Sequence, residues 1–345
     1  FNGLVSSVNI AQNAPGPLQS FWVGDASGNG NWLVASNWLP AVVPSASSVV
    51  FISRPGTYTV TMTGSATVAQ LWLGADDASG TQTLSLPGYL TLGFASGAVA
   101  TGGALQLGPY AIVQNSAFFN VSGVVSFEGY GATLAGAGDF VVQLAGRVRL
   151  DGSTTWSSKR VVNRGLLELL PGCTLSISAV AIVNEDSGII QTAGWGGCAV
   201  NAASSSGNSL TNFGVIRLSD APLHRHDASS GDVLLTERTQ RLSFSSFSFA
   251  NNGTVSVPEF SSLTLYSMAT ALGPQTLLTG SGLLEARSGS IRLAEVQAAA
   301  AFTIVLSSGA ALRPDPQGSF VPVPLTVTLT GYSTIAGSGN LTVAG

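Results

Sequence analysis

A short turn signal, Asn-x-Gly or Gly-x-Gly followed at once by a strand-like run, recurs through most of the chain. Its clear copies begin at Gly136, Asn163, Asn212, Asn251, Gly280 and Gly337, with a looser copy from Asn184 to Gly188. Successive copies are separated by 27, 21, 28, 39, 29 and 57 residues. A repeat of about 20–30 residues that holds two or three short strands is typical of a β-solenoid. Asn and Gly suit its corners because both tolerate the left-handed backbone conformation.

Between the turn signals, large apolar residues fall on alternate positions. The run from Thr57 to Met62 alternates in this way, and so do the shorter runs around Val125, Val148, Leu167 and Ile216. Alternation with a period of two is the pattern of a β-strand with one buried face. Each run is short and is bounded by Gly, Asn, Ser or Pro. We therefore expect an all-β chain.

Two all-β architectures fit short strands, and the spacing of the repeat decides between them. β-Sandwich domains of about 100 residues also carry turn signals every 8–12 residues. The recurrence at the length of one solenoid turn favours a right-handed parallel β-helix, in which similar inward residues stack into columns. At about 25 residues per turn, residues 56–345 would form roughly eleven turns and a rod on the order of 50 Å long.

The two ends of the chain and one long interval between successive turn signals differ from the repeat. Residues 1–55 are rich in Trp and Pro and lack the turn signal, so we expect an N-terminal cap there. The 39-residue step predicts a loop insertion near residues 220–235, where the polar segment from His224 to Gly231 lies. No comparable cap follows residues 341–343, so we expect the chain to continue or a second copy to cover this end.

Charged residues make up only 9% of the chain, against roughly 25% in ordinary soluble domains. The net charge is −4 and Lys159 is the single lysine, which argues against nucleic-acid binding. No run reaches the roughly 18 consecutive apolar residues that a membrane-spanning helix needs, so we expect no membrane insertion. The segment from Phe1 to Gly16 does not read as a signal peptide. Because the chain starts without Met, it reads as a mature or partial chain.

The opening segment resembles the start of known surface proteins. Its residues are Phe21-Trp22, Asn31-Trp32, Asn37-Trp38-Leu39-Pro40, Val43-Pro44, Val49–Ile52 and Tyr58-Thr59-Val60. A typical later turn is the run from Asn251 to Val257. Together these features resemble extracellular right-handed parallel β-helix repeat proteins, such as bacterial autotransporter passengers and surface adhesins of algae and other protists. The resemblance implies a secreted, surface-exposed rod, and it implies no catalytic residues.

Two cysteines, Cys173 and Cys198, lie 25 residues apart, which is close to one turn. Equivalent positions on adjacent turns have Cα atoms about 4.8 Å apart, within the range that a disulfide spans. One hypothesis is a turn-to-turn disulfide formed in an oxidising compartment. The alternative is that both thiols are buried apolar side chains.

Three N-glycosylation sequons begin at Asn120, Asn252 and Asn340. A chain this rich in Ser, Thr and Asn carries about that many by chance. In a secreted eukaryotic protein, glycans there would help to solubilise a surface that is poor in charge.

Metal-ligand residue types cluster only at His224, His226 and Asp227. The chain has no third histidine, so a solvated loop is the better interpretation, and we expect neither a metal nor a cofactor.

A polysaccharide-active β-helix enzyme would need clustered carboxylates on one face. The pairs Asp76-Asp77 and Glu185-Asp186 do not make a site alone, because adjacent strand residues face opposite sides. Convergence across turns stays open for Asp139, Asp151, Glu168 and Asp186. An aromatic stripe for sugar rings, with core packing as its alternative, is open for Trp72, Tyr89, Tyr110, Phe118, Phe119 and Tyr130.

These patterns predict a structural or adhesive extracellular β-solenoid and not an enzyme. We expect it to be a subunit or segment of a surface filament, appendage or layer on the cell surface. Its expected partners are copies of itself, other surface or appendage proteins, and glycans. The alternative function is a carbohydrate-binding adhesin or a polysaccharide-active β-helix enzyme.

Overall fold

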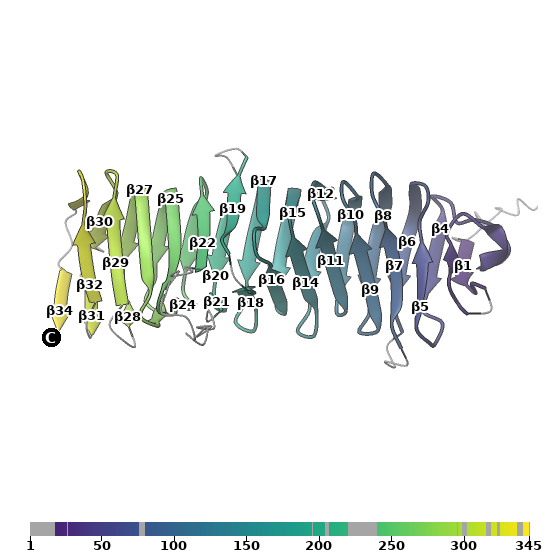
Figure 1. Ribbon diagram of the computed structural model, residues 1–345, viewed down its shortest axis with the longest axis horizontal. Coiled ribbons are helices and arrows are strands. Elements are labelled where there is room, and N and C mark those ends of the chain that lie inside the picture. The colour runs from purple at the N-terminus through teal and green to yellow at the C-terminus, as the bar shows by residue number, and fades with distance from the viewer. Residues whose placement is uncertain are drawn as a thin grey trace, which may run out of the picture.

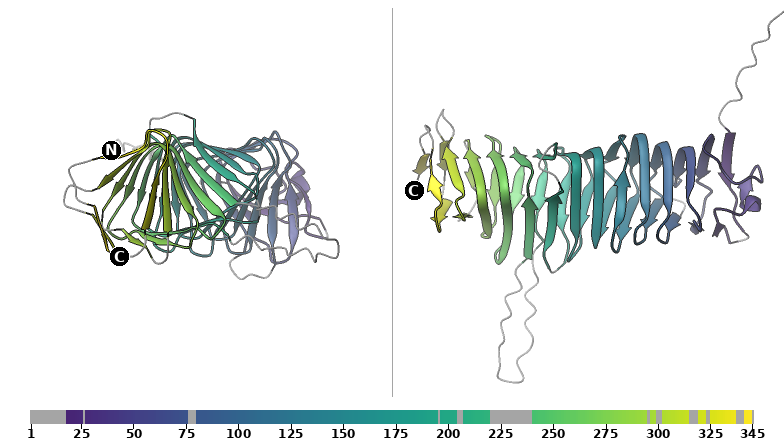
Figure 2. Two further views of the ribbon diagram at one scale, coloured as in Figure 1. Left: turned by 60° about the vertical axis from the view of Figure 1, so that its left-hand side comes forward. Right: turned by 90° about the horizontal axis from the view of Figure 1, so that it is seen from above.

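The computed structural model describes residues 18–25, 27–75, 80–194, 196–203, 207–219, 240–294, 296–298, 302–314, 319–322, 325–336 and 341–344. They form a parallel β-solenoid of about 12 turns (Figure 1). The views in Figures 1 and 2 agree on one elongated stack, with β1 (Leu18–Trp22) and β34 (Leu341–Ala344) at opposite ends. The predicted all-β fold built from parallel turns is confirmed.

The smaller of the two long sheets stacks one strand from each turn in chain order. Its strands in the described part of the chain are β2 (Gly30–Asn31), β5 (Tyr58–Thr61), β7 (Gln82–Leu86), β9 (Gly103–Leu107), β11 (Val124–Glu128), β14 (Arg147–Asp151), β16 (Leu166–Leu169), β18 (Ile189–Thr192), β21 (Val215–Arg217), β24 (Thr254–Ser256), β26 (Leu277–Thr279) and β28 (Gln297–Ala298).

The larger sheet receives one long strand or two short strands from each turn. Beginning with β1, these are β3 (Trp38–Leu39), β4 (Ser48–Ile52), β6 (Ala66–Leu73), β8 (Thr91–Val99), β10 (Ile112–Val121), β12 (Ala132–Ala135), β13 (Asp139–Val142), β15 (Ser153–Asn163), β17 (Thr174–Asn184), β19 (Cys198–Ala202), β20 (Ser209–Asn212), β22 (Gln240–Ser245), β23 (Ser248–Asn251), β25 (Ser261–Leu272), β27 (Leu283–Leu293), β29 (Phe302–Ser307), β30 (Ala311–Pro314), β32 (Leu325–Leu329) and β33 (Thr334–Ile335). Separately, β31 (Ser319–Pro322) pairs in parallel with β34.

Long strands of the larger sheet bend near their middle. Ser158 in β15, Ala179 in β17 and Ser267 in β25 have positive φ angles of 53°, 54° and 49°. The equivalent bend between β12 and β13 uses Gly136, with a φ of 91°. Glycine adopts this left-handed conformation freely because it has no Cβ, whereas the Cβ of Ser and Ala disfavours it.

Inward side chains stack in register along the rod. One column of the smaller sheet passes through buried apolar residues on successive turns: Leu84, Leu105, Val125, Val148, Leu167, Ile190, Ile216, Val255, Leu278 and Ala298. Burying one side chain of this size contributes about 1.5–3 kcal/mol. The period-two alternation therefore places one apolar layer on each turn.

A column of asparagines runs inside the larger sheet. Asn163, Asn184, Asn212 and Asn251 are fully buried and occupy equivalent positions on four successive turns. The Nδ2 atom of each of the first three donates to Oδ1 of the next, at 2.7, 2.6 and 2.6 Å. Asn251 Nδ2 then donates to Thr276 Oγ1 at 3.1 Å. We call these four residues the asparagine ladder.

The φ angles of the asparagine ladder contradict the expectation that Asn and Gly of the Asn-x-Gly repeat adopt the left-handed backbone conformation. None of its four asparagines has a positive φ, and neither do Gly188, Gly214 and Gly253, which follow them. A Cβ on any of these glycines would lie 2.2 Å from a backbone oxygen of the preceding turn. Asparagine is thus used for its inward amide, and glycine for the close approach of two backbones.

At the N-terminal end, the parallel stack already begins within the segment expected to form a cap. Strand β1 pairs in parallel with β4, and its Trp22 lies opposite Trp38 of β3 in an antiparallel pair. Trp22, Trp32 and Trp38 are buried, with ring centroids 4.9 Å apart in each edge-to-face pair. A short 3₁₀ helix, η1 (Ala35–Asn37), leads into β3. The capping role of residues 1–55 stays a prediction.

The predicted insertion near residues 220–235 lies outside the described residues. On either side of it, β21 stacks on β24 and β19 stacks on β22. The solenoid therefore continues in register across the 39-residue step of the repeat.

Candidate functional site

The two cysteines form a disulfide between adjacent turns. Cys173 immediately precedes β17, and Cys198 is the first residue of β19. Their Cα atoms are 4.8 Å apart, and both residues are buried. This is the turn-to-turn pairing that the 25-residue spacing predicts.

The sequons fall at different kinds of position. Asn120 lies in β10, where its Oδ1 accepts a hydrogen bond from Gln143 Nε2 at 3.3 Å. Asn252 lies in the corner after β23, and its backbone N–H donates to the backbone carbonyl of Asn212 at 2.7 Å. Both are half-buried, whereas Asn340 lies outside the described residues. Their glycosylation stays a prediction.

The histidine-rich segment also lies outside the described residues, including His224, His226 and Asp227. Among the residues that the structure describes, no group of three or more His, Cys, Asp or Glu side chains is arranged to hold a metal ion. Within the same residues, no helix has the length and apolar character needed to cross a bilayer.

The acidic residues singled out from the sequence are distributed over separate surfaces. Asp139 lies in the larger sheet, and Asp151 and Glu168 lie in the smaller one. Glu168 is buried and binds Arg147 at 2.7 Å and Arg149 at 3.0 Å. It is held as a structural anion between two guanidinium groups.

Other acidic side chains also pair with arginines on neighbouring turns. Asp139 binds Arg160 at 3.3 Å, and Glu185 binds Arg164 at 2.7 Å. The hydrogen bond from Arg164 holds the pKa of Glu185 below its usual value. These exposed ion pairs link neighbouring turns, and each contributes about 0–1 kcal/mol.

Three tyrosines form an exposed ladder along one corner of the rod. Tyr89, Tyr110 and Tyr130 are 80%, 46% and 70% exposed. The rings of Tyr89 and Tyr110 stack with centroids 4.6 Å apart and an interplanar angle of 19°. The backbone N–H of Tyr110 donates to Tyr130 O at 2.9 Å, which places Tyr130 on the next turn. We call these residues the tyrosine ladder.

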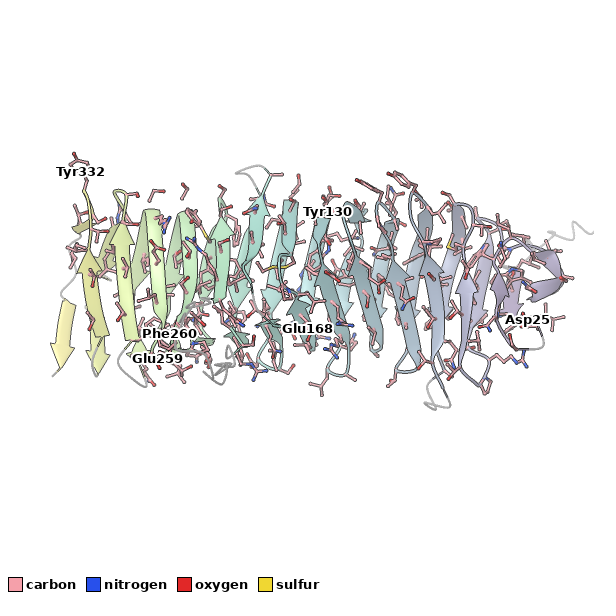
Figure 3. The ribbon with its side chains drawn as sticks, viewed as in Figure 1. Asp25, Tyr130, Glu168, Glu259, Phe260 and Tyr332 are labelled. Carbon is pink, nitrogen blue, oxygen red and sulfur yellow. A yellow bond between two sulfur atoms is a disulfide. The ribbon has the colours of Figure 1, made fainter. Side chains whose placement is uncertain are left out.

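The corner backbone holds these rings outward. Tyr89 and Tyr110 have positive φ angles of 50° and 61°. A Cβ on Gly131 would lie 2.5 Å from the Tyr110 ring, so a glycine is needed where the ring lies against the next corner. Figure 3 shows Tyr130 at one long edge of the rod and Glu168 toward the opposite edge.

The other aromatics of the predicted stripe lie elsewhere. Trp72 and Phe118 are partly exposed on the outer face of the larger sheet. Phe119 is fully buried and packs against Phe94 and Phe140. The six residues therefore divide between the tyrosine ladder, an outer face and the core.

Two carboxylates flank the tyrosine ladder. Glu128 ends β11, two residues before Tyr130, and lies directly opposite Asp151 of β14. Both side chains are exposed and line a cavity of about 120 Å³. Sequence reasoning missed Glu128, although its 23-residue separation from Asp151 is close to one turn.

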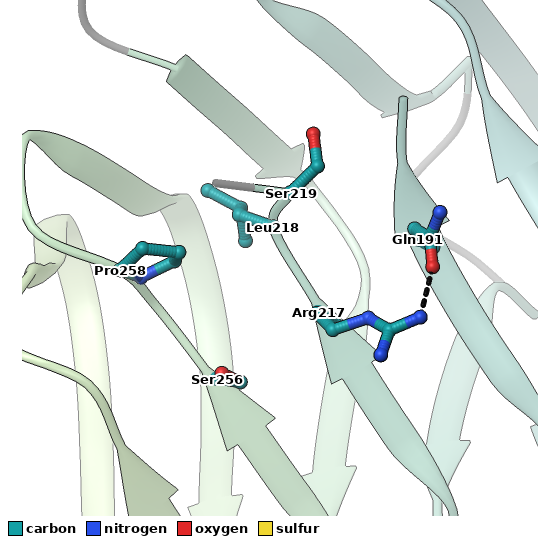
Figure 4. A pocket seen from close by; sticks show the side chains of 6 residues that line it. All are labelled: Gln191, Arg217, Leu218, Ser219, Ser256 and Pro258. Atoms are coloured by element: carbon teal, nitrogen blue, oxygen red, sulfur yellow. Dashed lines mark hydrogen bonds between the residues drawn. The ribbon is translucent and has the colours of Figure 1, made fainter. Parts of the chain in front are cut away.

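A larger open cavity of about 300 Å³ lies beside β21 (Figure 4). Its lining is mostly polar: Gln191, Arg217, Leu218, Ser219, Ser256 and Pro258. Arg217 Nη2 donates a hydrogen bond to Gln191 Oε1 across adjacent turns, which holds the guanidinium along the wall of the cavity.

A comparison of this chain with protein-family models, with curated proteins and with solved structures finds no match in any of the three.

Proposed function

We propose that this protein is a structural and adhesive extracellular rod, a subunit or segment of a surface filament, appendage or layer. The observation that carries the proposal is the in-register stacking of about 12 turns. Each turn binds the next through parallel hydrogen-bond ladders in both long sheets. Bending such a stack would strain many backbone hydrogen bonds at once, so the geometry suits a stiff spacer.

The covalent chemistry of the chain supports an extracellular location. The Cys173–Cys198 bond is a type of cross-link that persists in oxidising compartments. The described sequons at Asn120 and Asn252 and the resemblance to surface repeat proteins agree with that location.

An apolar column on the outer face of the larger sheet is the proposed contact for a second copy or for another surface protein. Phe21, Phe51 and Trp72 occupy equivalent outward positions on successive turns. The rings of Phe21 and Phe51 stack with centroids 5.0 Å apart, and the nearby Leu39 is also exposed. Contiguous exposed apolar side chains of this kind favour association.

Sedimentation velocity over a wide concentration range, with electron microscopy of the same samples, tests this proposal. We expect elongated particles whose association increases with concentration. Trp72→Ser should weaken association, whereas Tyr332→Ser, a matched change at an exposed aromatic far along the rod, should leave it unchanged. Particles that stay monomeric at all concentrations would argue against self-assembly, and compact particles would rule out the rod.

The tyrosine ladder supports a second candidate function, carbohydrate binding. Aromatic faces pack well against the C–H faces of sugar rings, and the stacked tyrosines repeat at the spacing of the turns. Glu128 and Asp151 beside the ladder would accept hydrogen bonds from sugar hydroxyls. A glycan array followed by titration of the hits tests this function.

Substitution separates binding from catalysis at this corner. Tyr110→Ala should abolish glycan binding, with Tyr332→Ala as the matched control. Paired carboxylates are also the catalytic groups of many glycoside hydrolases. Release of reducing sugars that is lost in Glu128→Gln would identify an enzyme in place of an adhesin. Absence of binding to any glycan on the array would reject the carbohydrate function.

A further inference from the structure

Lys159 is the one lysine in a chain with twelve arginines, and it is buried. It lies in β15, one residue after the bend at Ser158, and only 3% of its surface is exposed. Its neighbour Arg160 instead reaches the surface, where it pairs with Asp139. A buried position that holds the only lysine, in a chain whose other basic side chains apart from two histidines are arginines, points to a property that arginine lacks. The relevant property is that a lysine amine can lose its proton and act as a nucleophile.

The ammonium group of Lys159 contacts an asparagine amide and two backbone carbonyls. Its Nζ atom donates to Asn115 Oδ1 and to the carbonyls of Gly136 and Gly138, at 3.0 and 3.1 Å. None of the ion pairs found among the described residues includes Lys159. The charge is therefore held by neutral oxygens in a buried site, which is a costly arrangement for an ammonium ion.

Asn115 is fixed against this amine. It lies in β10, is almost fully buried, and its Nδ2 donates to Asp139 O at 3.2 Å. A Cβ on Gly138 would lie 2.3 Å from Asn115 Nδ2, so the corner glycine makes room for the amide. Because Oδ1 is bonded directly to Cγ, the hydrogen bond from Lys159 holds the amine next to the electrophilic carbon.

Burial also favours the neutral form of the Lys159 amine. Desolvation lowers the pKa of Lys159 to about 8, although the negative charge of Asp139 acts in the opposite direction. A neutral amine is thus accessible near neutral pH, which is the form that attacks a carbonyl carbon.

We propose that Lys159 and Asn115 form an intramolecular isopeptide bond. The neutral Nζ attacks Cγ of Asn115 and forms a new C–N bond. One Nζ proton passes to Nδ2, the bond between Cγ and Nδ2 breaks, and ammonia leaves. No oxidant or reductant is needed, because an amide and an amine become a substituted amide and ammonia. The remaining N–H keeps a hydrogen bond to a carbonyl of the Gly136–Gly138 corner.

The bond would tie together turns that are not adjacent. Asn115 and Lys159 are 44 residues apart, and the turn that contains β12 and β13 lies between them. The product would be a covalent strap across that middle turn, in addition to the disulfide. The inference is independent of the proposed function, since it depends only on the buried amine and the amide.

Intact-mass spectrometry of the folded wild-type chain, made without glycosylation and then reduced, tests the proposal. We expect a mass lower than the sequence mass by one ammonia. Tandem spectra should show the peptide with Asn115 joined to the peptide with Lys159, and trypsin should not cleave after Lys159. Lys159→Arg and Asn115→Ala should each restore the full sequence mass. Asn120→Ala, a matched change on the same strand, should keep the loss.

The wild-type measurement is decisive even where a variant fails to fold. A reduced wild-type chain with the full sequence mass, whose Lys159 reacts with an amine reagent after denaturation, would overturn the proposal. A loss of ammonia that maps to another asparagine, such as Asn252 before Gly253, would overturn it as well.

Discussion

The side chain of Asn184 donates a hydrogen bond of 2.6 Å from Nδ2 to Oδ1 of Asn212 on the next turn, and both residues are fully buried. Asn184 also accepts from Asn163 and donates to the carbonyl of Gly188 at 3.0 Å. It therefore satisfies polar groups on three turns at once. A buried polar network of this kind is stabilising only while every member keeps its partners.

Asn184→Leu should destabilise the rod strongly. It removes the donor to Asn212 Oδ1, and it leaves Asn163 Nδ2 with Ile189 O, at 3.1 Å, as its remaining acceptor. A buried polar atom left without a partner costs about 1–3 kcal/mol. Asn163→Val is the matched control, because it breaks only the one ladder bond to Asn184 Oδ1, while Asn163 Oδ1 already lacks a partner and the residue below it in the column is Val142. Urea denaturation followed by circular dichroism should give a clearly larger shift of the midpoint for Asn184→Leu. Equal shifts would mean that the ladder does not act as a network.

Removal of the disulfide should lower stability by about 3 kcal/mol, as expected for a closed loop of 25 residues. The double variant Cys173→Ala, Cys198→Ala removes the bond without leaving a free thiol. Urea denaturation of the wild type should shift when a reductant is added, and the double variant should not respond. A wild-type midpoint that ignores the reductant would contradict this prediction.

Substitution of Glu168 by alanine should lower the free energy of unfolding more than substitution of Asp139. Glu168 is buried and binds two arginines, whereas the pair between Asp139 and Arg160 is exposed on both sides. Exposed pairs contribute about 0–1 kcal/mol. Glu168→Ala should lower the free energy of unfolding by about 2 kcal/mol, because it removes charge-assisted hydrogen bonds. Asp139→Ala should lie within about 0.5 kcal/mol of the wild type. If thermal denaturation shows a larger loss of stability for Asp139→Ala than for Glu168→Ala, the prediction is wrong.

Stability at alkaline pH should depend on Tyr58. Burial raises the pKa of Tyr58 to about 12, above its ordinary value of 10.0, with a smaller opposing effect of Arg54. The unfolded chain then loses this proton first as the pH rises. The contribution of Tyr58 is therefore fully present below pH 10 and is lost between pH 10 and 12.

Tyr58→Phe should remove this part of the pH dependence. Urea midpoints of the two proteins should keep a constant difference below pH 10, and the wild type should lose stability relative to the variant above it. Parallel curves up to pH 12 would show that Tyr58 titrates normally in the folded state.

The sequence by itself determined the all-β class and the repeating turn, and it offered the bond between Cys173 and Cys198 as one of two alternatives. Alternation with a period of two requires a strand with one buried face, and its recurrence near 25 residues places Val125, Val148 and Leu167 in one column. The same spacing brings Cys173 opposite Cys198. These features are local or nearly periodic, so they can be counted along the chain.

Only the tertiary structure decided where the polar side chains meet. Residue type did not distinguish an asparagine in a left-handed corner from one that points inward, so the asparagine ladder was not predicted. The repeat aligns the four asparagines of the ladder at spacings of 21, 28 and 39 residues, but this spacing does not show that their amides point inward and bind one another. The contact between Asn115 and Lys159 skips a whole turn and depends on a corner at Gly136 that admits both side chains. Such contacts are set by the shape of each corner, which the alternation of apolar residues does not encode.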